Sequence, residues 1–310
     1  MATHKLPGIF GPRKYSYEEL AEATGHFSNK YSIGQGGFGQ VFRGSLDGGI
    51  YAIKKLYDVK GFEDEIAVVS HVGHRNLVTM VGYCIEEPNA LIVLEYFPNK
   101  SLRFHLHENK SLDWPKRMRI AIGSAKGLEY RHEHCKPKII HQDIEPDNIL
   151  FDDNFEPKVA DFGLAWFFPD AVSHLYKSIQ GTIDYIDSER YERVFEEVSD
   201  KSDVYSFGVV LLELIIGRKV KYEDIQRAKA RMMQALNGEY TNFVDFNLQN
   251  YNRREMKGMI FCAASCVYKP LNSRPTMKKH SKLRDYGYVM QIVRALEKDI
   301  LLKDIWDGND

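Results

Sequence analysis

A glycine-rich segment with strand-like residues on both sides is the feature that most limits how this chain can fold. The segment from Gly34 to Val41 fits the spacing GxGxxGxV. In a dinucleotide-binding βαβ unit such glycines open a helix, and an acidic residue follows about 20 positions later. Here they lead into a second strand-like run, Ile50–Leu56, through the turn Asp47-Gly48-Gly49. The sequence therefore predicts a β-hairpin flap whose backbone N–H groups can approach phosphates, and it disfavours a Rossmann fold.

The residue pattern changes near position 100. Short strand-like runs separated by glycine turns dominate 31–97, and one helical stretch at 61–71 interrupts them. Apolar residues at helical spacing mark 114–134 and 203–216, and a loop-rich region at 139–200 lies between them. We predict an α+β fold with a small antiparallel β-sheet lobe carrying one helix, a larger, mainly α-helical lobe, and a site between them. The predicted boundaries are an N-terminal arm at 1–30, a small lobe at 31–97, a large lobe at 98–299 and a C-terminal tail at 300–310.

Composition narrows the class of protein. The 310 residues carry 42 Lys and Arg against 43 Asp and Glu, and this formal net charge of −1 argues against a nucleic-acid-binding protein. The most apolar stretch, 207–217, is short and contains Glu213, so we expect no transmembrane segment. The N-terminus suggests neither a signal peptide nor a myristoylation site. Four cysteines are too few for a disulfide scaffold, and Cys262 and Cys266 have no metal-ligating partners nearby. We therefore expect a protein of a reducing compartment, with no cysteine metal site.

Lys54 lies near the end of the strand-like run Ile50–Leu56 that follows the glycine segment. A candidate ionic partner, Glu65, lies eleven residues later inside the predicted helix, where it would aim the Lys54 ammonium at phosphate oxygens. Glu63 and Asp64 are alternative partners. The apolar spacing of the helix places Glu65 beside its buried stripe, which favours Glu65.

The loop-rich region carries the strongest chemical signal. Residues 141–148 fit the pattern HxDxxxxN with apolar strand-like runs on either side, and Asp161-Phe162-Gly163 follows thirteen residues after Asn148. Phosphoryl transfer needs a carboxylate to orient the attacking hydroxyl, and carboxylate and amide oxygens to hold Mg²⁺. Asp143 supplies the first, and Asn148 and Asp161 supply the second. A cluster of capping and turn residues is the alternative interpretation, and the order of glycine loop, lysine and acidic loop disfavours it.

Together these motifs resemble the eukaryotic protein kinase domain, and further stretches resemble the plant receptor-like kinases. The similarity is to the proline-rich extensin-like receptor kinase and receptor-like cytoplasmic kinase group, and it covers roughly 15–298. The stretches that carry it lie at 15–28, 74–84, 123–128, 202–208 and 274–277. The resemblance implies the bilobal protein kinase fold, ATP and Mg²⁺ as cofactors, and transfer of the γ-phosphate to protein Ser or Thr hydroxyls.

The resemblance also implies an ATP site. It places the hinge around Glu95–Phe97, the gatekeeper at Leu94 and a flap over the triphosphate at Ile33–Val41. The implied nucleotide-binding residues are Ile33, Gly34, Gln35, Gly36, Gly37, Phe38, Gly39, Gln40, Val41, Ala52, Lys54, Leu94, Glu95, Phe97 and Leu150.

In the larger lobe, the resemblance implies that Asp203 steadies the loop that carries Asp143 and that Glu189 pairs with Arg274. It further implies protein substrates, an upstream membrane receptor kinase as a partner, and a cytoplasmic location that extends to the inner face of the plasma membrane. The chain is then either a receptor-like cytoplasmic kinase or a fragment of a membrane receptor.

Several positions depart from the family pattern. Gln142 stands where the family's His-Arg-Asp motif has Arg. A Gln side chain cannot form the bidentate hydrogen bonds that Arg makes to a phosphate on the activation segment. Glu145 replaces a Lys that touches the γ-phosphate, and two unit charges about 4 Å apart interact by roughly 4 kcal/mol at an effective dielectric of 20. Asp187-Ser188-Glu189 replaces Ala-Pro-Glu, Asp184 replaces Gly, and Arg131 replaces Leu.

These departures leave two functional interpretations open. The first is a serine/threonine kinase of the non-RD type with low activity, which the retained Lys54, Asp143, Asn148 and Asp161 favour. The second is a pseudokinase scaffold that binds ATP or a partner kinase without transferring phosphate, which Glu145, Gln142 and Ser188 favour. A small-molecule kinase on the same fold is disfavoured, because Gly181-Thr182 suits protein Ser/Thr acceptors.

Overall fold

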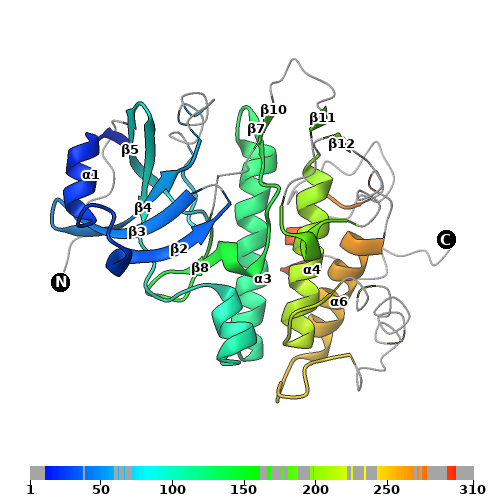
Figure 1. The fold of residues 1–310 in the computed structure, drawn as a ribbon. Coiled ribbons are helices and arrows are strands. Elements are labelled where there is room, and N and C mark those ends of the chain that lie inside the picture. The colour runs from blue at the N-terminus through cyan, green and yellow to red at the C-terminus, as the bar shows by residue number, and fades with distance from the viewer. Residues whose placement is uncertain are drawn as a thin grey trace. The chain divides into compact units, whose positions relative to one another are not determined.

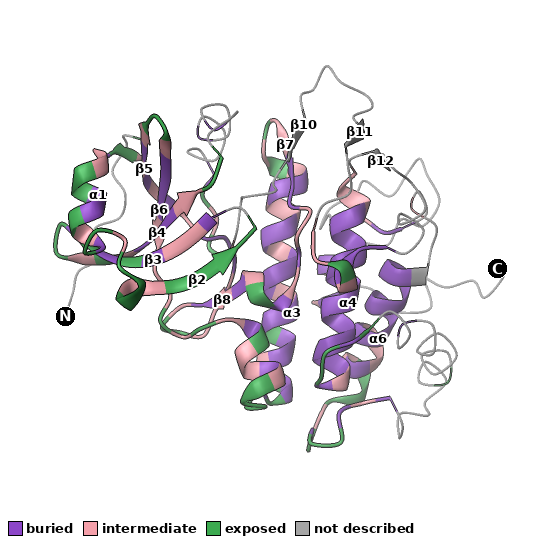
Figure 2. Cartoon of the chain, in the orientation of Figure 1, coloured by how far each residue is buried: buried purple, intermediate pink, exposed green. Residues whose placement is uncertain are grey.

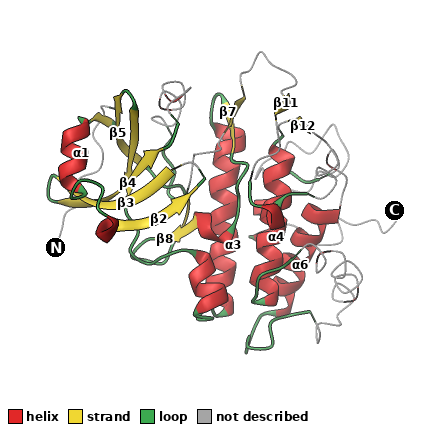
Figure 3. Cartoon of the chain, in the orientation of Figure 1, coloured by secondary structure: helices red, strands yellow, loops and turns green. Residues whose placement is uncertain are grey.

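The computed structural model divides the chain into two compact units, residues 1–98 and 99–310 (Figure 1). The smaller unit contains the six-stranded sheet, and the larger unit contains most of the helices (Figure 3). This agrees with the α+β class and the two lobes predicted from the sequence. The structure describes residues 11–37, 39–58, 62, 66, 72–160, 166–168, 176–177, 181–187, 196–197, 199–221, 225, 234, 243–268, 271, 274–277 and 292–297.

A six-stranded sheet forms the framework of the smaller unit. All neighbouring strands are antiparallel except β1 and β5, which run parallel. The strands lie in the order β1 (Arg13–Lys14), β5 (Met80–Glu86), β6 (Asn89–Glu95), β4 (Gly49–Leu56), β3 (Gly39–Leu46) and β2 (Ser32–Gly36).

The hairpin between β3 and β4 has a two-residue turn. Leu46 pairs with Gly49, and the residues between them, Asp47 and Gly48, have φ of 49° and 78°. Positive φ at both central positions is the requirement of a type I′ turn, which matches the twist of the flanking strands. The turn predicted from the sequence is therefore confirmed.

The residues expected to form an N-terminal arm pack on this sheet. Helix α1 (Tyr17–Ala23) begins with a capping box, in which Ser16 accepts from the Glu19 amide and the Glu19 carboxylate accepts from the Ser16 amide. Leu20 is fully buried in a core cluster that also contains residues of β4, β5 and β6. A short 3₁₀ turn, η1 (Asn29–Tyr31), leads into β2.

The helix expected at 61–71 is described only at Phe62 and Ile66. Both have helical backbone and buried side chains. The remaining residues of that prediction, including Glu65 and its alternatives Glu63 and Asp64, lie outside the described residues.

Four α-helices are described in the larger unit. Asp113 caps the N-terminus of α3 and Ser199 that of α4, while Gly217 ends α4 in the left-handed conformation with φ of 76°. Almost every residue of α4 is buried, as expected for a helix surrounded by other elements (Figure 2). The helices are α3 (Trp114–Glu129), α4 (Asp200–Ile216), α6 (Arg253–Tyr268) and α7 (Ile292–Leu296).

The helix predicted at 114–134 changes character before its end. α3 stops at Glu129, and a π-helical turn, η3 (Tyr130–His134), continues it. Arg131 in this turn is fully buried. A second π-helical turn, η2 (Phe104–Glu108), precedes α3.

Short strand pairs and turns occupy the predicted loop-rich region. Strand β7 (Lys138–Ile140) pairs with β10 (Trp166–Phe168), and β8 (Ile149–Phe151) pairs with β9 (Pro157–Val159). The loop of the HxDxxxxN motif therefore has a strand on each side, as predicted. The other short elements are η4 (Pro146–Asn148), β11 (Tyr176–Lys177), η5 (Ile183–Tyr185) and β12 (Glu196–Glu197).

Candidate active site

Asp203 in α4 holds the loop between β7 and β8. Its side chain is fully buried, and its two oxygens accept hydrogen bonds from the amides of His141 (2.7 Å) and Gln142 (2.8 Å). The ring Nε2 of His132 lies 2.7 Å from the same carboxylate. Burial alone would raise the pKa of Asp203, but the hydrogen bonds and charges of His132 and His141 together outweigh it and lower that pKa. The role that the resemblance implies for Asp203 is therefore visible in its contacts.

The loop needs this support because its backbone is strained. Gln142 has φ of 67°, a left-handed conformation that few residues other than glycine adopt readily. His141 links this loop to Ala160. Its Nδ1 accepts a hydrogen bond from the amide of Asp143 (3.2 Å), so Nε2 carries the proton of the ring. Nε2 donates to the carbonyl of Ala160 (2.7 Å).

Both carboxylate oxygens of Asp143 have hydrogen-bond donors. Oδ1 lies 3.1 Å from the backbone nitrogen of Thr182 and 3.3 Å from its hydroxyl, and Oδ2 lies 3.2 Å from Nδ2 of Asn148. Gly181 allows the approach of the Thr182 segment, because it has φ of 112° and a Cβ there would lie 2.6 Å from the carbonyl oxygen of Gln142. Asp143 is thus a half-buried carboxylate with a fixed orientation.

Asn148 uses its amide nitrogen inside the loop. Nδ2 also donates to the carbonyl of Asp143 over 2.8 Å. The opposite atom of the side chain, Oδ1, accepts no hydrogen bond from the residues that the structure describes, so a hard cation could use it as an oxygen ligand. The second predicted ligand, Asp161, lies outside the described residues. In the described part of the chain, no group of three or more His, Cys, Asp and Glu side chains is arranged to hold a metal.

Glu145 lies half-buried in the same loop. Burial raises the pKa of its carboxyl to about 7, and the charges of Asp143 and Asp147 add to this rise. A hydrogen bond with Thr182 and the charge of Lys219 oppose the rise. The carboxyl is therefore partly protonated near neutral pH, so the charge reversal relative to the family's Lys is only partial at that pH.

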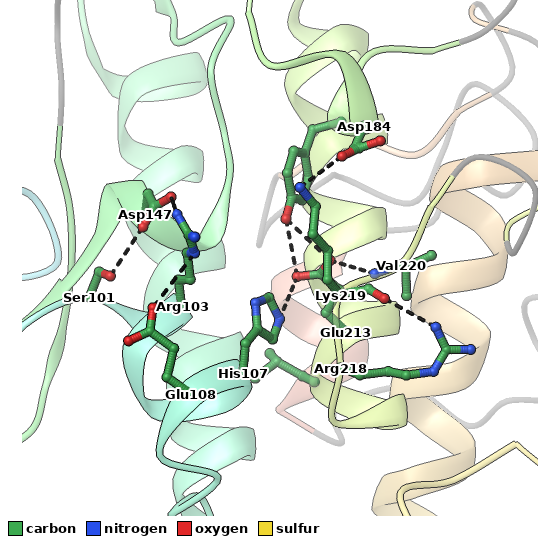
Figure 4. A network of polar contacts seen from close by, with 12 residues as sticks. Ser101, Arg103, His107, Glu108, Asp147, Asp184, Glu213, Arg218, Lys219 and Val220 are labelled. Atoms are coloured by element: carbon green, nitrogen blue, oxygen red, sulfur yellow. Dashed lines mark hydrogen bonds and ion pairs between the residues drawn. The ribbon is translucent and has the colours of Figure 1, made fainter. Parts of the chain in front are cut away.

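Other charged groups beside the loop are tied into pairs (Figure 4). Arg103 donates to Asp147 over 3.0 Å, and Lys219 lies 2.8 Å from Asp184. The carboxylate of Glu213, which is fully buried, accepts from the amide of Val220 and from the Tyr185 hydroxyl. Asp184, where the family has Gly, is thus held by a cation instead of standing as an isolated charge.

The smaller unit places several predicted nucleotide-binding residues on one face of its sheet. Lys54 is buried on β4 and pairs in register with Val41 and Ile92, while Ala52 pairs with Leu94. Residues two apart on a strand share a face, so Ala52 and Lys54 point the same way. Val41 and Leu94 are therefore brought to the same face as Lys54.

The glycine segment forms β2, the start of β3 and the turn between them. Gln35 pairs with Gln40 and Gly36 with Gly39, and the Gln35 side chain donates to the Tyr57 hydroxyl over 2.9 Å. Around Gly34, Gly36 and Gly37 a Cβ would meet no atom within 4 Å, so this segment leaves room for a ligand. Ile33 is exposed, and Phe38 lies outside the described residues.

The remaining predicted nucleotide-binding residues fall in both units. The Glu95 carboxylate accepts from the amide of Thr79 over 3.0 Å, and Phe97 is half-buried. Leu150, in the larger unit, lies on β8 and pairs with Lys158.

Arg274 binds Asp187, a residue that the sequence analysis noted only as a departure from the family pattern. Its Nη2 donates to the carboxylate of Asp187, and both side chains are buried. Its guanidinium also lies 4.9 Å from the ring centroid of Tyr205. Glu189, the partner expected from the resemblance, lies outside the described residues. The contacts of Thr182 with Asp143 and of His132 with Asp203 were not predicted from the sequence, because neither contact is encoded by local spacing.

Comparison with known proteins identifies the family. The protein kinase domain family matches residues 27–291. The chain is 44% identical over 317 residues to the proline-rich receptor-like protein kinase PERK15 of Arabidopsis thaliana, with 96% of this chain and 60% of that protein covered. It is 41% identical over 323 residues to PERK1 of the same organism, with 97% and 47% covered. The chain thus spans about half the length of the curated relatives it matches. None of the helices in the described ranges has the length and hydropathy that a membrane span needs. The chain belongs to the protein kinase family, and its relatives include the plant proline-rich receptor-like kinases.

Proposed function

We propose that this protein is a serine/threonine kinase that uses ATP and Mg²⁺ and has low activity. The observation that carries the proposal is the environment of Asp143. Its carboxylate has donors on both oxygens, and Asp203 anchors the loop that presents it. A group that orients a reacting atom must be held in one position. The hydrogen bonds from Thr182 and Asn148 hold the Asp143 carboxylate in this way.

Asp143 has the role of accepting the proton of the attacking Ser or Thr hydroxyl. The donor contacts of Thr182 and Asn148 fix the direction in which its lone pairs can act. The retained Gly181-Thr182 supports Ser/Thr acceptors through the resemblance to the family, and the Thr182 backbone N–H places this segment against the Asp143 carboxylate.

Lys54 has the role of holding the α- and β-phosphates, with Glu65 as its brace, and residues 33–41 cover the triphosphate. The hinge at Glu95–Phe97 and the side chains of Ala52 and Leu94 hold the adenine. A basic side chain buried on a strand needs an anionic ligand or partner to offset its desolvation.

Asn148 and Asp161 are the residues that would hold Mg²⁺. Their donor set fits the ion, since Asn148 keeps its amide oxygen available while its nitrogen binds Asp143. Bound there, Mg²⁺ would neutralise charge on the phosphates.

Glu145 supports the second candidate function, a pseudokinase scaffold. A carboxyl next to Asp143, at a position where the family has Lys, removes a cation that stabilises the transferred phosphate. Loss of one such contact commonly costs on the order of 10²–10³ in rate. If the rate falls below detection, the chain would act by binding ATP or a partner kinase.

We further infer that the substrates are proteins and that an upstream membrane receptor kinase is a partner. The protein would act in the cytoplasm, at the inner face of the plasma membrane. The support is the similarity to relatives that are named proline-rich receptor-like protein kinases.

The proposal is tested by incubating the purified chain with labelled ATP and Mg²⁺, alone and with a generic basic protein. Phosphoamino-acid analysis should find phosphoserine or phosphothreonine. Label on tyrosine alone would refute the assigned specificity. No label from folded protein that binds ATP would establish the scaffold instead.

A further inference from the structure

Part of the smaller unit's core comes from residues that precede the region matched by the kinase family. The family match begins at residue 27, whereas β1 and α1 lie at 13–23. Tyr15 and Leu20 are buried in the same core cluster as Ile53 of β4. Figure 1 shows α1 beside the sheet, close to β3 and β5. This segment is therefore built into the fold of the smaller unit.

Two aromatic rings, those of Tyr17 and Phe27, enclose the ammonium group of Lys55. Nζ lies 4.5 Å from the ring centroid of Phe27 and 5.1 Å from that of Tyr17, and it donates a hydrogen bond to the Tyr17 hydroxyl over 3.2 Å. The two rings also contact each other, with centroids 5.4 Å apart. Among the described residues, no carboxylate pairs with Lys55, so the rings are its principal partners.

Lys55 adjoins Lys54 on β4, and the two side chains point to opposite faces of the sheet. The α1 face also carries Gly44, where an added Cβ would lie 3.4 Å from the carbonyl oxygen of Ala23. On the same face, the Phe27 ring packs against Phe42 of β3 at 5.5 Å. The contacts around Lys55 therefore fix the strand backbone at the residue next to Lys54.

Resting on the proposed role of Lys54 in phosphate binding, we propose that Lys55 is a positioning residue for Lys54. Tyr17 and Phe27 hold Lys55 on the α1 face of the sheet, and this fixes the direction in which Lys54 leaves the strand. Through Tyr17, the segment that precedes the family match thereby contributes to nucleotide binding without touching the nucleotide.

The test compares MgATP affinity in the full chain and in Lys55→Met, which keeps the length of the side chain and removes its charge. Lys55→Arg keeps the cation and a donor for the Tyr17 hydroxyl. Lys30→Met is the matched control, because Lys30 also lies over a ring of the smaller unit, Tyr31 at 5.6 Å, but not on β4.

Lys55→Met should weaken MgATP binding about three- to tenfold, the range expected for loss of a partly buried cation–aromatic contact, and raise the KM for ATP in parallel. The kcat should change less than twofold. Lys55→Arg should restore parental affinity, and Lys30→Met should match the parent. The thermal midpoint of each variant is measured alongside, so that a general loss of folded protein is recognised.

Unchanged MgATP affinity in Lys55→Met would overturn the inference. So would a lowered thermal midpoint with parental affinity, because that result assigns Lys55 a purely structural role. If the parent itself binds no MgATP, the role of Lys54 and the inference both fall. That outcome differs from a defect confined to the Lys55 variant.

Discussion

The backbone N–H of Thr182 donates to Oδ1 of Asp143 over 3.1 Å, and the Thr182 hydroxyl lies 3.3 Å from the same oxygen. Thirty-nine residues separate the two positions in the sequence. The contact fixes the carboxylate that we propose receives the proton of the acceptor hydroxyl, and it joins the segment at 181–187 to the loop that carries Asp143.

Thr182→Val keeps the shape of the side chain and removes its hydroxyl. Hydrogen bonds to charged groups contribute about 1.5–3 kcal/mol, so we expect kcat to fall roughly 10- to 100-fold. Thr182→Ser, which retains the hydroxyl, should stay within a few fold of the parent. Steady-state phosphate transfer measures both, and parental kcat in Thr182→Val would exclude a role for this hydroxyl.

Glu145→Lys restores the charge of the family at the position beside Asp143. If the carboxyl limits the rate, we expect transfer to rise about tenfold or more, because the new cation stabilises the transferred phosphate. Glu145→Gln, which removes the charge without adding a cation, should give a smaller rise. Equal rates for the parent and both variants would mean that Glu145 does not limit catalysis.

The raised pKa of Glu145 also predicts how stability depends on pH. The group titrates at about 7 in the folded protein and near 4.5 in the unfolded chain, so between these values the folded state binds more protons. The free energy of unfolding therefore falls as pH rises through this window, and the loss is complete above the folded pKa. Relative to Glu145→Gln, the parent should lose about 1–3 kcal/mol between pH 5 and pH 8.

Urea unfolding of the parent and Glu145→Gln at both pH values measures this difference. The comparison cancels the titration of other groups. If the difference in the free energy of unfolding between the parent and Glu145→Gln is the same at pH 5 and pH 8, the assigned pKa shift of Glu145 is wrong.

The buried pair of Arg274 and Asp187 should be important for stability. Asp187→Asn leaves the buried guanidinium without the charge of this partner, and we expect a loss of about 2–4 kcal/mol. The exposed pair of Arg103 and Asp147 provides the comparison, since Arg103→Gln should cost less than about 1 kcal/mol. Chemical unfolding measures both free energies of unfolding. Equal losses in the two variants would show that the buried pair contributes no more to stability than the exposed pair.

Local signals in the sequence were sufficient for much of the fold. Ser16 and Glu19 stand at the spacing of a capping box, and Asp47-Gly48 supplies the two positive φ angles of a tight hairpin. Each of these features depends on residues within a few positions of one another. The same holds for the strands on either side of the loop that carries Asp143, because their apolar runs adjoin the HxDxxxxN motif.

Contacts between distant segments were beyond the sequence. Eighty-seven residues separate Asp187 from Arg274, and nothing in the spacing indicates that they meet. The pKa of Glu145 depends on how far packing excludes water from its carboxyl, which residue order does not reveal. The change from α3 to a π-helical turn at Tyr130 likewise has no local signal that we can identify.

The most direct test of the account is phosphate transfer by the parent and by Asp143→Asn, run side by side with labelled ATP and Mg²⁺. Asn keeps the size of the side chain but accepts a proton poorly, so we expect transfer to fall by about 10²–10⁴ while ATP binding is kept. Equal transfer by the two proteins would contradict the assignment of Asp143 as the residue that receives the proton of the acceptor hydroxyl.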